Sequence, residues 1–254
     1  MKKTLIALII STALIAGVFA SGSAESSKTG GYGRGNGTQQ GQGRGYGRGV
    51  NAENNGAIQR ENMETLLASY KPKTLDDEEK AGILLMREEE KLARDVYNAL
   101  YEKWNIPVFR NIAGAEQTHM DAVGMLIERY NLTDPVSRDI PGKFDNPELQ
   151  KLYNSLTVEG KESLENALRV GATVEDLDIS DLKKLIAKTD NDDIKIVYQN
   201  LEKGSRNHLR SFVYQLKREG ANYSPQYISK EYYNKIITTD RETGRMIEDP
   251  NFEF

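Results

Sequence analysis

The chain has 254 residues, with 38 acidic side chains against 34 lysines and arginines, and 38% of its residues are hydrophobic. This size and apolar content suit one or two globular domains, and the mild negative charge gives no general attraction to nucleic acid. The chain contains no cysteine, which excludes disulfides, thiolate catalysis and iron–sulfur clusters. Any metal ion must therefore be held by Asp, Glu and His.

The first 20 residues have the pattern of an export signal. Lys2 and Lys3 precede an apolar run over residues 5–20, which ends in small residues before Ser21. An uncleaved anchor is the alternative, but the run is shorter than the roughly 20 residues that cross a bilayer comfortably. We predict a signal peptide over residues 1–20, cleaved after Ala20, and an exported protein, periplasmic or secreted.

Residues 21–57 have the composition of a disordered linker. They hold twelve of the 22 glycines, and Gly-Tyr-Gly-Arg-Gly occurs at both 31–35 and 45–49. Such a segment buries too little apolar surface to repay the entropy of ordering. Arg-Gly segments also occur in RNA-binding proteins, but an exported protein rarely meets RNA. We predict a Gly/Arg-rich linker followed by one helical domain over residues 58–254.

Beyond the linker, apolar residues recur at the three and four spacing of amphipathic helices. The pattern predicts four long helices, over residues 76–104, 108–130, 159–188 and 192–218. Very short connections join the first pair and the last pair, as in antiparallel hairpins. The middle connection, residues 131–158, is long and contains at most a short helix near 147–156. An all-α, ferritin-like four-helix bundle with one long crossover between helices 2 and 3 is the predicted fold.

The first helix carries consecutive acids where its apolar stripe passes. Glu89 lies between Leu85, Leu92 and Val96 on this stripe, and Glu90 lies at its edge. Helix geometry favours Glu89 as the inward carboxylate, and at least one of the two must be buried.

The second helix places an acid and a histidine side by side. Glu116 and His119 are three residues apart and share the apolar face with Ile112 and Val123. Buried carboxylates are costly without a partner, and a metal ion would supply one. A surface glutamate beside a hydrogen-bonded core histidine is the alternative, since Glu-x-x-His alone is a weak signal.

The last two helices supply further inward groups. Glu175 is one turn beyond Gly171 on the third helix, and Asp178 follows three residues later. His208, the second of only two histidines, lies on the apolar stripe of the fourth helix. Four helices that each provide an inward acid or histidine are typical of dinuclear carboxylate sites.

The first-helix pattern Glu90, Ala93, Tyr97 resembles that of ferritins, bacterioferritins and rubrerythrins. The resemblance favours Glu90 over Glu89 as a ligand, and it implies the same role for Glu116, His119, Glu175 and His208. The sequence of residues 74–227 is similar to an uncharacterised ferritin-like family of bacteria and archaea, which is classed as a domain of unknown function.

One position departs from that pattern. Ser205 stands where the fourth-helix Glu-x-x-His of ferritins and rubrerythrins has its glutamate, three residues before His208. Asp178 could substitute for the missing carboxylate, or it could cap a helix break near Ile179 and Ser180. We therefore expect unequal sites: Glu90, Glu116 and His119 bind one ion tightly, and Glu175, His208 and Asp178 bind another more weakly.

The resemblance implies one or two iron or manganese ions that act on Fe(II), oxygen or peroxide, as in a ferroxidase-like or peroxide-linked oxidoreductase. A structural bundle is the alternative, in which the carboxylates pair with Arg87, Arg94 or Arg210. We expect metal ions as partners and a homodimer as one option, but no nucleic acid and, after cleavage, no membrane. Without metal, crowding and burial should raise the pKa values of the clustered acids unless cations compensate, and loss of Glu116 should relieve repulsion rather than unfold the protein.

Overall fold

The structure of the protein is a computed structural model that describes residues 57–254. The predicted signal peptide, and the linker up to residue 56, lie outside the described residues. Within the described part, the chain forms seven helices and no strand. These are α1 (Arg60–Ala68), α2 (Asp77–Trp104), α3 (Pro107–Arg129), α4 (Pro147–Gly160), α5 (Leu164–Lys188), α6 (Asp192–Arg218) and α7 (Lys230–Thr238). The all-helical prediction is confirmed for this part of the chain.

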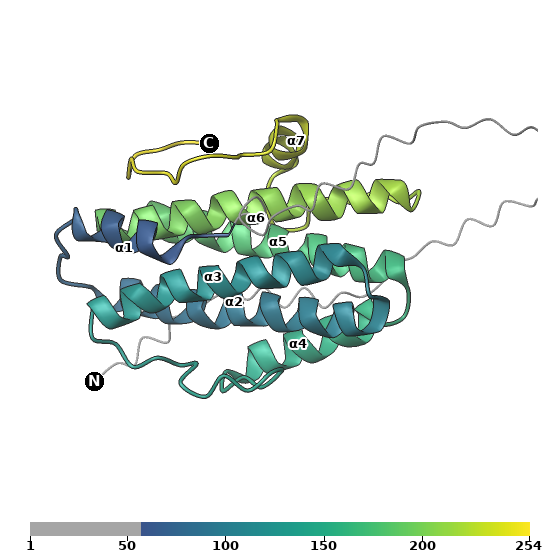
Figure 1. Cartoon of the computed structure of the whole chain (residues 1–254), viewed down its shortest axis with the longest axis horizontal. Helices are drawn as coiled ribbons and strands as arrows, with labels where there is room; N and C mark the ends of the chain where they lie inside the picture. The colour runs from purple at the N-terminus through teal and green to yellow at the C-terminus, as the bar shows by residue number, and fades with distance from the viewer. Residues whose placement is uncertain (1–56) are drawn as a thin grey trace, which may run out of the picture. The chain divides into compact units, whose positions relative to one another are not determined.

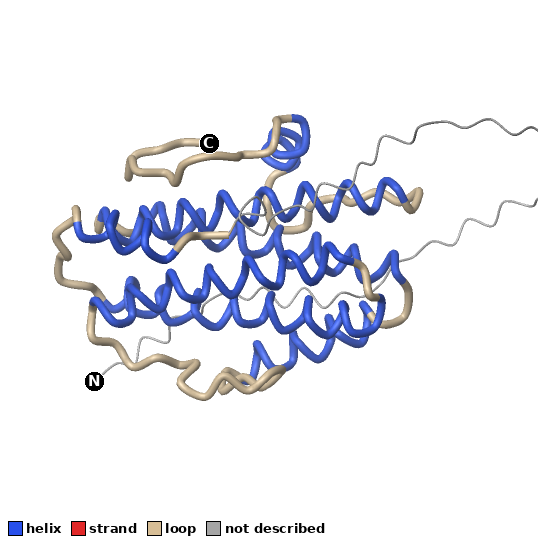
Figure 2. Tube along the Cα trace, viewed as in Figure 1, coloured by secondary structure: helices blue, strands red, loops and turns tan. Residues whose placement is uncertain are grey.

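The four longest helices lie side by side as two hairpins, α2 with α3 and α5 with α6 (Figure 1). The hairpins contact each other through α2 with α5 and α3 with α6. The tan connection after α3 in Figure 2, followed by α4, carries the chain along the molecule, so that α3 and α5 run in the same direction. The side chains between these four helices are therefore drawn from both hairpins.

Local sequence explains where the long helices begin and end. Asp76 and Glu79 form a reciprocal capping box at the start of α2, with hydrogen bonds of 2.7 and 3.0 Å. Asn105 ends α2 in the left-handed conformation, with φ of 51°, and Pro107 starts α3. These signals place three of the four predicted helices within two residues of their observed bounds.

The predicted third helix begins five residues too early. Residues 159 and 160 belong to α4, and the side chain of Ser163 accepts a hydrogen bond from the backbone of Asn166, which caps α5 instead. Helix α5 then continues without interruption to Lys188. The alternative role for Asp178, as the cap of a helix break near Ile179 and Ser180, is therefore excluded.

Helices α1 and α7 were not predicted, and each has only nine residues. Helix α1 packs against α3, and α7 packs against α6. Met63 of α1 and Ile236 of α7 are fully buried. Helices this short are marginal in isolation, so tertiary packing supplies most of their stability.

Among the described residues, no helix combines the length and apolar character required to cross a membrane.

Candidate metal centre

Five polar side chains converge in the space between α2, α3, α5 and α6. Each is at most 2% exposed, although all carry ionisable groups: Glu90, Glu116, His119, Glu175 and His208. The two imidazole rings stack with their centroids 5.5 Å apart. Both histidines therefore face the interior, one from each hairpin, as the apolar stripes predict.

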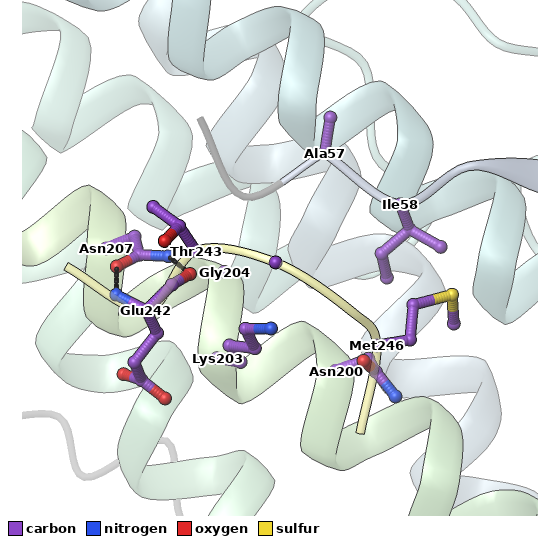
Figure 3. Close-up of a pocket in the computed structure, with 10 residues that line it drawn as sticks. Ala57, Ile58, Asn200, Lys203, Gly204, Asn207, Glu242, Thr243 and Met246 are labelled. Carbon is purple, nitrogen blue, oxygen red and sulfur yellow. Dashed lines mark hydrogen bonds between the residues drawn. The ribbon is translucent and has the colours of Figure 1, made fainter. Parts of the chain in front are cut away.

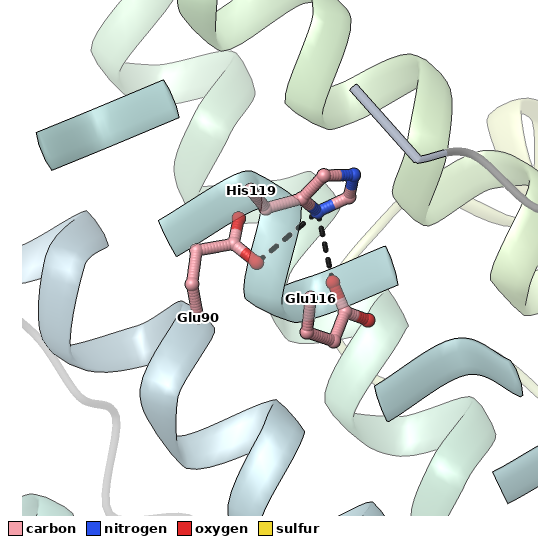
Figure 4. Close-up of side chains that lie close together, drawn as sticks. All are labelled: Glu90, Glu116 and His119. Atoms are coloured by element: carbon pink, nitrogen blue, oxygen red, sulfur yellow. Dashed lines mark hydrogen bonds and ion pairs between the residues drawn. The ribbon is translucent and has the colours of Figure 1, made fainter. Parts of the chain in front are cut away.

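Glu116 lies between the two histidines. Its Oε2 is 2.8 Å from Nδ1 of His119, and its Oε1 is 2.9 Å from Nδ1 of His208. Glu90 approaches His119 Nδ1 at 3.2 Å (Figure 4), and Glu175 approaches His208 Nδ1 at 3.4 Å. One carboxylate thus contacts both imidazoles, and one further carboxylate contacts each imidazole from the side.

This geometry defines two groups that could each hold a metal ion. Glu90, Glu116 and His119 form one, and Glu116, Glu175 and His208 form the other, with the ligand atoms of each group within 4.8 Å of one another. Glu116 is common to both. The predicted division, which assigned Glu116 to the first group alone, differs from the structure, where each group has three donors.

The structure separates the two acids between which the sequence pattern could not decide. Glu90 belongs to the first group, whereas Glu89 is buried but belongs to neither. Neighbouring residues on a helix point about 100° apart, so both can be buried while only one faces the histidines.

Asp178 lies outside both groups. It is partly buried, and its Oδ2 lies 2.5 Å from the hydroxyl oxygen of Ser205. Ser205, which stands where the ferritin pattern has a glutamate, therefore contacts Asp178. Asp178 is the acid that we expected to replace that glutamate. Asp178 is therefore hydrogen-bonded to Ser205 and contributes to neither group in this structure.

The arginines that the structural alternative requires are engaged elsewhere. Arg87 pairs with Asp134 at 3.0 Å, Arg94 with Asp139 at 2.5 Å, and Arg210 with Glu242 at 3.1 Å. Among the described residues, the acids of the two groups therefore make ion pairs with the histidines and with no arginine.

Tyr97 supports the second group from α2. Its hydroxyl donates a hydrogen bond to Oε1 of Glu175 at 2.5 Å, and its ring packs against Phe212 with centroids 5.2 Å apart. A methyl group added at Gly171 would lie 2.5 Å from the Phe212 ring. The missing side chain at Gly171 therefore lets Phe212 fill the space beside Tyr97, which fixes the tyrosine that orients Glu175.

The pKa values of the three clustered acids are shifted in different directions: two are raised and that of Glu116 is lowered. Burial raises the pKa of Glu90 to about 7, and burial together with the Glu116 charge raises the pKa of Glu175 to about 8. Burial would also raise the pKa of Glu116, but the imidazoles of His208 and His119 outweigh it and hold that pKa well below its usual range. The pKa of Glu116 is therefore lowered rather than raised, because the two imidazoles compensate the charge of this acid.

The histidines show the reciprocal effect. Burial alone would lower the pKa of His208, but the Glu116 and Glu175 carboxylates raise it to about 10. The Glu90 and Glu116 carboxylates likewise raise the pKa of His119 well above its usual range, against the effect of burial. Without metal, protons on these imidazoles compensate the buried carboxylates.

The donor set fits a divalent cation. Oε1 of Glu90 is fully buried and has no hydrogen-bond partner among residues 57–254, a costly arrangement for a carboxylate oxygen. Carboxylate oxygen and imidazole nitrogen together suit iron, manganese and zinc. The side chains thus define an all-helical protein with a buried carboxylate and histidine cluster that could hold metal.

Comparison with known proteins shows the family of the chain. The chain belongs to the family described as "Uncharacterized protein domain (DUF2202)", whose model matches residues 79–240. It is 57% identical over 178 residues to the uncharacterized protein MJ0754 of Methanocaldococcus jannaschii. The aligned region covers 70% of this chain and 96% of that protein. A crystal structure of the hypothetical protein MJ0754 from Methanococcus jannaschii superposes with a TM-score of 0.67 at 57% identity, and covers 68% of this chain and 98% of that one. The predicted membership of a family of unknown function is confirmed.

Proposed function

We propose that this protein is an exported, ferritin-like four-helix-bundle protein whose buried cluster binds two divalent metal ions, iron or manganese. The position of Glu116, whose two oxygens each contact a different histidine, is the observation that carries the proposal. Glu116 would therefore be a ligand common to both groups. The shared direction of α3 and α5 also supports the ferritin-like topology, since a crossover between two hairpins produces it.

The residues would divide the work as follows. Glu90 and His119 would hold one ion, Glu175 and His208 the other, and Glu116 both. Bound iron or manganese would supply one-electron redox chemistry toward oxygen, peroxide or Fe(II). The chain's own contribution is to exclude bulk water, since all five side chains are at most 2% exposed, and to orient Glu175 through the hydroxyl of Tyr97.

Elemental analysis tests the proposal most directly. The protein should be expressed with its own first 20 residues, recovered from the exported fraction without chelator, and analysed for iron, manganese and zinc. We expect close to two ions per chain and mature protein that begins at Ser21. Protein with less than a tenth of an ion per chain, which also fails to bind Fe(II) or Mn(II) in titration, would overturn the metal-binding proposal. Material retained inside the cell would overturn export.

A non-catalytic bundle is the second candidate, and the Ser205 contact favours it. The acids of the two groups have imidazole or hydroxyl partners within the protein, and Asp178 contacts Ser205, so the core has charge and hydrogen-bond compensation of its own. Oxidation of Fe(II) separates the two candidates. A redox centre should consume oxygen on addition of Fe(II) faster than the Glu116→Gln variant does. A structural site should bind metal and leave the oxygen consumption at the level of that variant.

A further inference from the structure

The chain after α7 lies along α6, and two buried asparagines of α6 bind its main chain (Figures 1 and 3). Asn207 donates through Nδ2 to the carbonyl oxygen of Glu242 and accepts through Oδ1 from the backbone N–H of the same residue, both at 3.0 Å. Asn200 pairs in the same way with Ile247, at 2.9 and 2.8 Å. Because each amide side chain both donates and accepts, each asparagine satisfies the N–H and the C=O of one residue.

A third main-chain contact falls between these two. Nζ of Lys203 donates to the carbonyl oxygen of Arg245 at 2.7 Å. Lys203 lies three residues after Asn200 and four before Asn207, so the three side chains share one face of the helix. Gly244 has a φ of 95°, a conformation that favours glycine, and it bends the segment between its contacts. Helix α6 therefore binds the main chain at three successive points.

Two arginines of α6 add a preference for particular side chains. Arg206 donates from Nε and Nη2 to the two carboxylate oxygens of Glu242, at 2.8 and 2.6 Å, and Arg210 donates to one of them at 3.1 Å. Bidentate, charge-assisted pairs of this kind are among the strongest hydrogen bonds in proteins. Cζ of Arg206 also lies 4.2 Å from the centre of the Phe254 ring. The contacts thus select an acid first and an aromatic ring later in the segment.

Little apolar surface holds this segment on α6. Within residues 241–254, Ile247 is the one buried residue, and this stretch forms no helix or strand. Regions with few buried apolar contacts open at a much lower free energy than the whole domain unfolds. The segment can therefore leave α6 while helices α2 to α6 stay folded.

The charges of the segment and of α6 are complementary. Residues 240–254 contain five acidic and two basic side chains, whereas Lys203, Arg206 and Arg210 contact the segment from α6. All of these bonds can form whether the segment belongs to the same copy of the chain or to another. Exchange of an identical element between copies is a low-cost route to a dimer for this reason.

We propose that α6 is a recognition surface for an extended acidic segment, and that it binds residues 240–254 of a second copy of this chain as it binds its own. Reciprocal exchange joins two copies into a symmetric dimer. A tethered segment has an effective concentration on the order of 1 mM, so the exchanged form increases with protein concentration.

A fluorescein-labelled synthetic peptide of residues 240–254 represents the segment of a second copy, and fluorescence anisotropy measures its binding to the full chain. The peptide competes with the chain's own segment. Glu242→Gln in the chain weakens that segment, so the peptide should bind about tenfold more tightly. Glu242→Gln in the peptide should weaken binding about tenfold. Glu253→Gln is the matched control in either place, because Glu253 is exposed on the same segment, and the affinity should stay that of the parent.

Single cysteines test exchange between whole copies, because the chain has none of its own. One copy carries Arg245→Cys on the segment and the other carries Lys203→Cys on α6. A short bismaleimide reagent joins the two copies when the segment of the first lies on α6 of the second. At about 1 mM protein we expect more of this joined pair than of the background pair, in which Glu102→Cys, exposed on α2, replaces Lys203→Cys.

Each outcome decides one part of the proposal. If the Glu242→Gln chain binds no peptide at about 1 mM, the recognition surface is refuted. If the two placements of Glu242→Gln shift the affinity in the same direction, the effect follows overall charge and recognition of Glu242 is refuted. If the peptide binds but the joined pair does not exceed the background pair, exchange between copies is wrong. Opposite shifts for the two placements, together with the joined pair, support the proposal.

Discussion

Replacement of Glu116 by Gln should remove the stabilisation that metal gives to the folded protein. Glu116 is the one acid that belongs to both groups of ligands. Glutamine keeps the shape of the side chain but removes the charge, so each group loses its shared anionic donor. Both positions should therefore be lost together, whereas replacement of Glu90 or Glu175 should weaken one position.

The expected size of the effect follows from linkage. An ion that binds only the folded state stabilises it by about 2.7 kcal/mol at a hundredfold excess over its dissociation constant. In a domain of roughly 200 residues, each kcal/mol corresponds to a shift of about 2–4 °C in Tm. One bound ion should therefore raise the Tm of the parent by about 5–11 °C, and the variant should gain little.

Differential scanning calorimetry with Mn(II) and with EDTA measures both states. Glu128→Gln is the matched control, because Glu128 lies exposed on the same helix, α3, and its variant should keep the full metal-dependent shift. The metal-free Glu116→Gln protein should melt below the metal-free parent, since His119 and His208 lose the carboxylate that lies 2.8 and 2.9 Å from them.

That last expectation reverses the one drawn from sequence alone, in which loss of an acid relieves repulsion. A fall in the metal-free Tm is therefore no argument against the metal centre. The reasoning is refuted if Mn(II), Fe(II) and Co(II) all leave the Tm of the parent unchanged. It is equally refuted if Glu116→Gln shows the same metal-dependent rise as the parent.

Four further predictions concern pH and packing. The pKa values of Glu90, Glu175 and His208 are all raised, to about 7, 8 and 10. Because these groups bind protons more tightly in the folded state, the metal-free protein should lose stability as the pH rises from 5 to about 10. Thermal unfolding at several pH values measures this loss. Metal must displace these protons, and its stabilising effect should accordingly be larger at about pH 8.5 than at about pH 6. Gly171→Ala should lower the free energy of unfolding by about 1–3 kcal/mol because the added methyl meets Phe212. Gly114→Ala, with open space around the added methyl, should raise it by up to about 1 kcal/mol in urea titrations.

The long helices could be predicted because their signals are local and repeated. Twenty or more residues of apolar periodicity define each of α2, α3, α5 and α6. Helices α2 and α5 begin at side-chain caps, and α3 begins at a proline. Helices α1 and α7 have nine residues each, which is too short for apolar periodicity to identify a helix. Their positions depend on contacts with α3 and α6, which no local pattern contains.

The candidate site was predictable to the extent that it follows from helix faces. Glu116, His119 and His208 lie on apolar stripes that periodicity identifies, and all three are buried together. The choice between Glu89 and Glu90 required the resemblance, because both acids are buried. The contact between Asp178 and Ser205 joins residues 27 apart on different helices, and it depends on the relative rotation of α5 and α6.

Charge balance explains how such a cluster can be buried without arginine. Glu116 is ionised between two imidazoles whose pKa values it raises. Glu90 and Glu175, with pKa values of about 7 and 8, can each hold a proton near neutral pH. The metal-free cluster therefore adjusts its own charge by protonation, and a divalent cation has to compete with protons rather than with a fixed guanidinium. Because a proton leaves more easily than a buried arginine side chain can move, this charge balance would leave the five residues available to a metal ion.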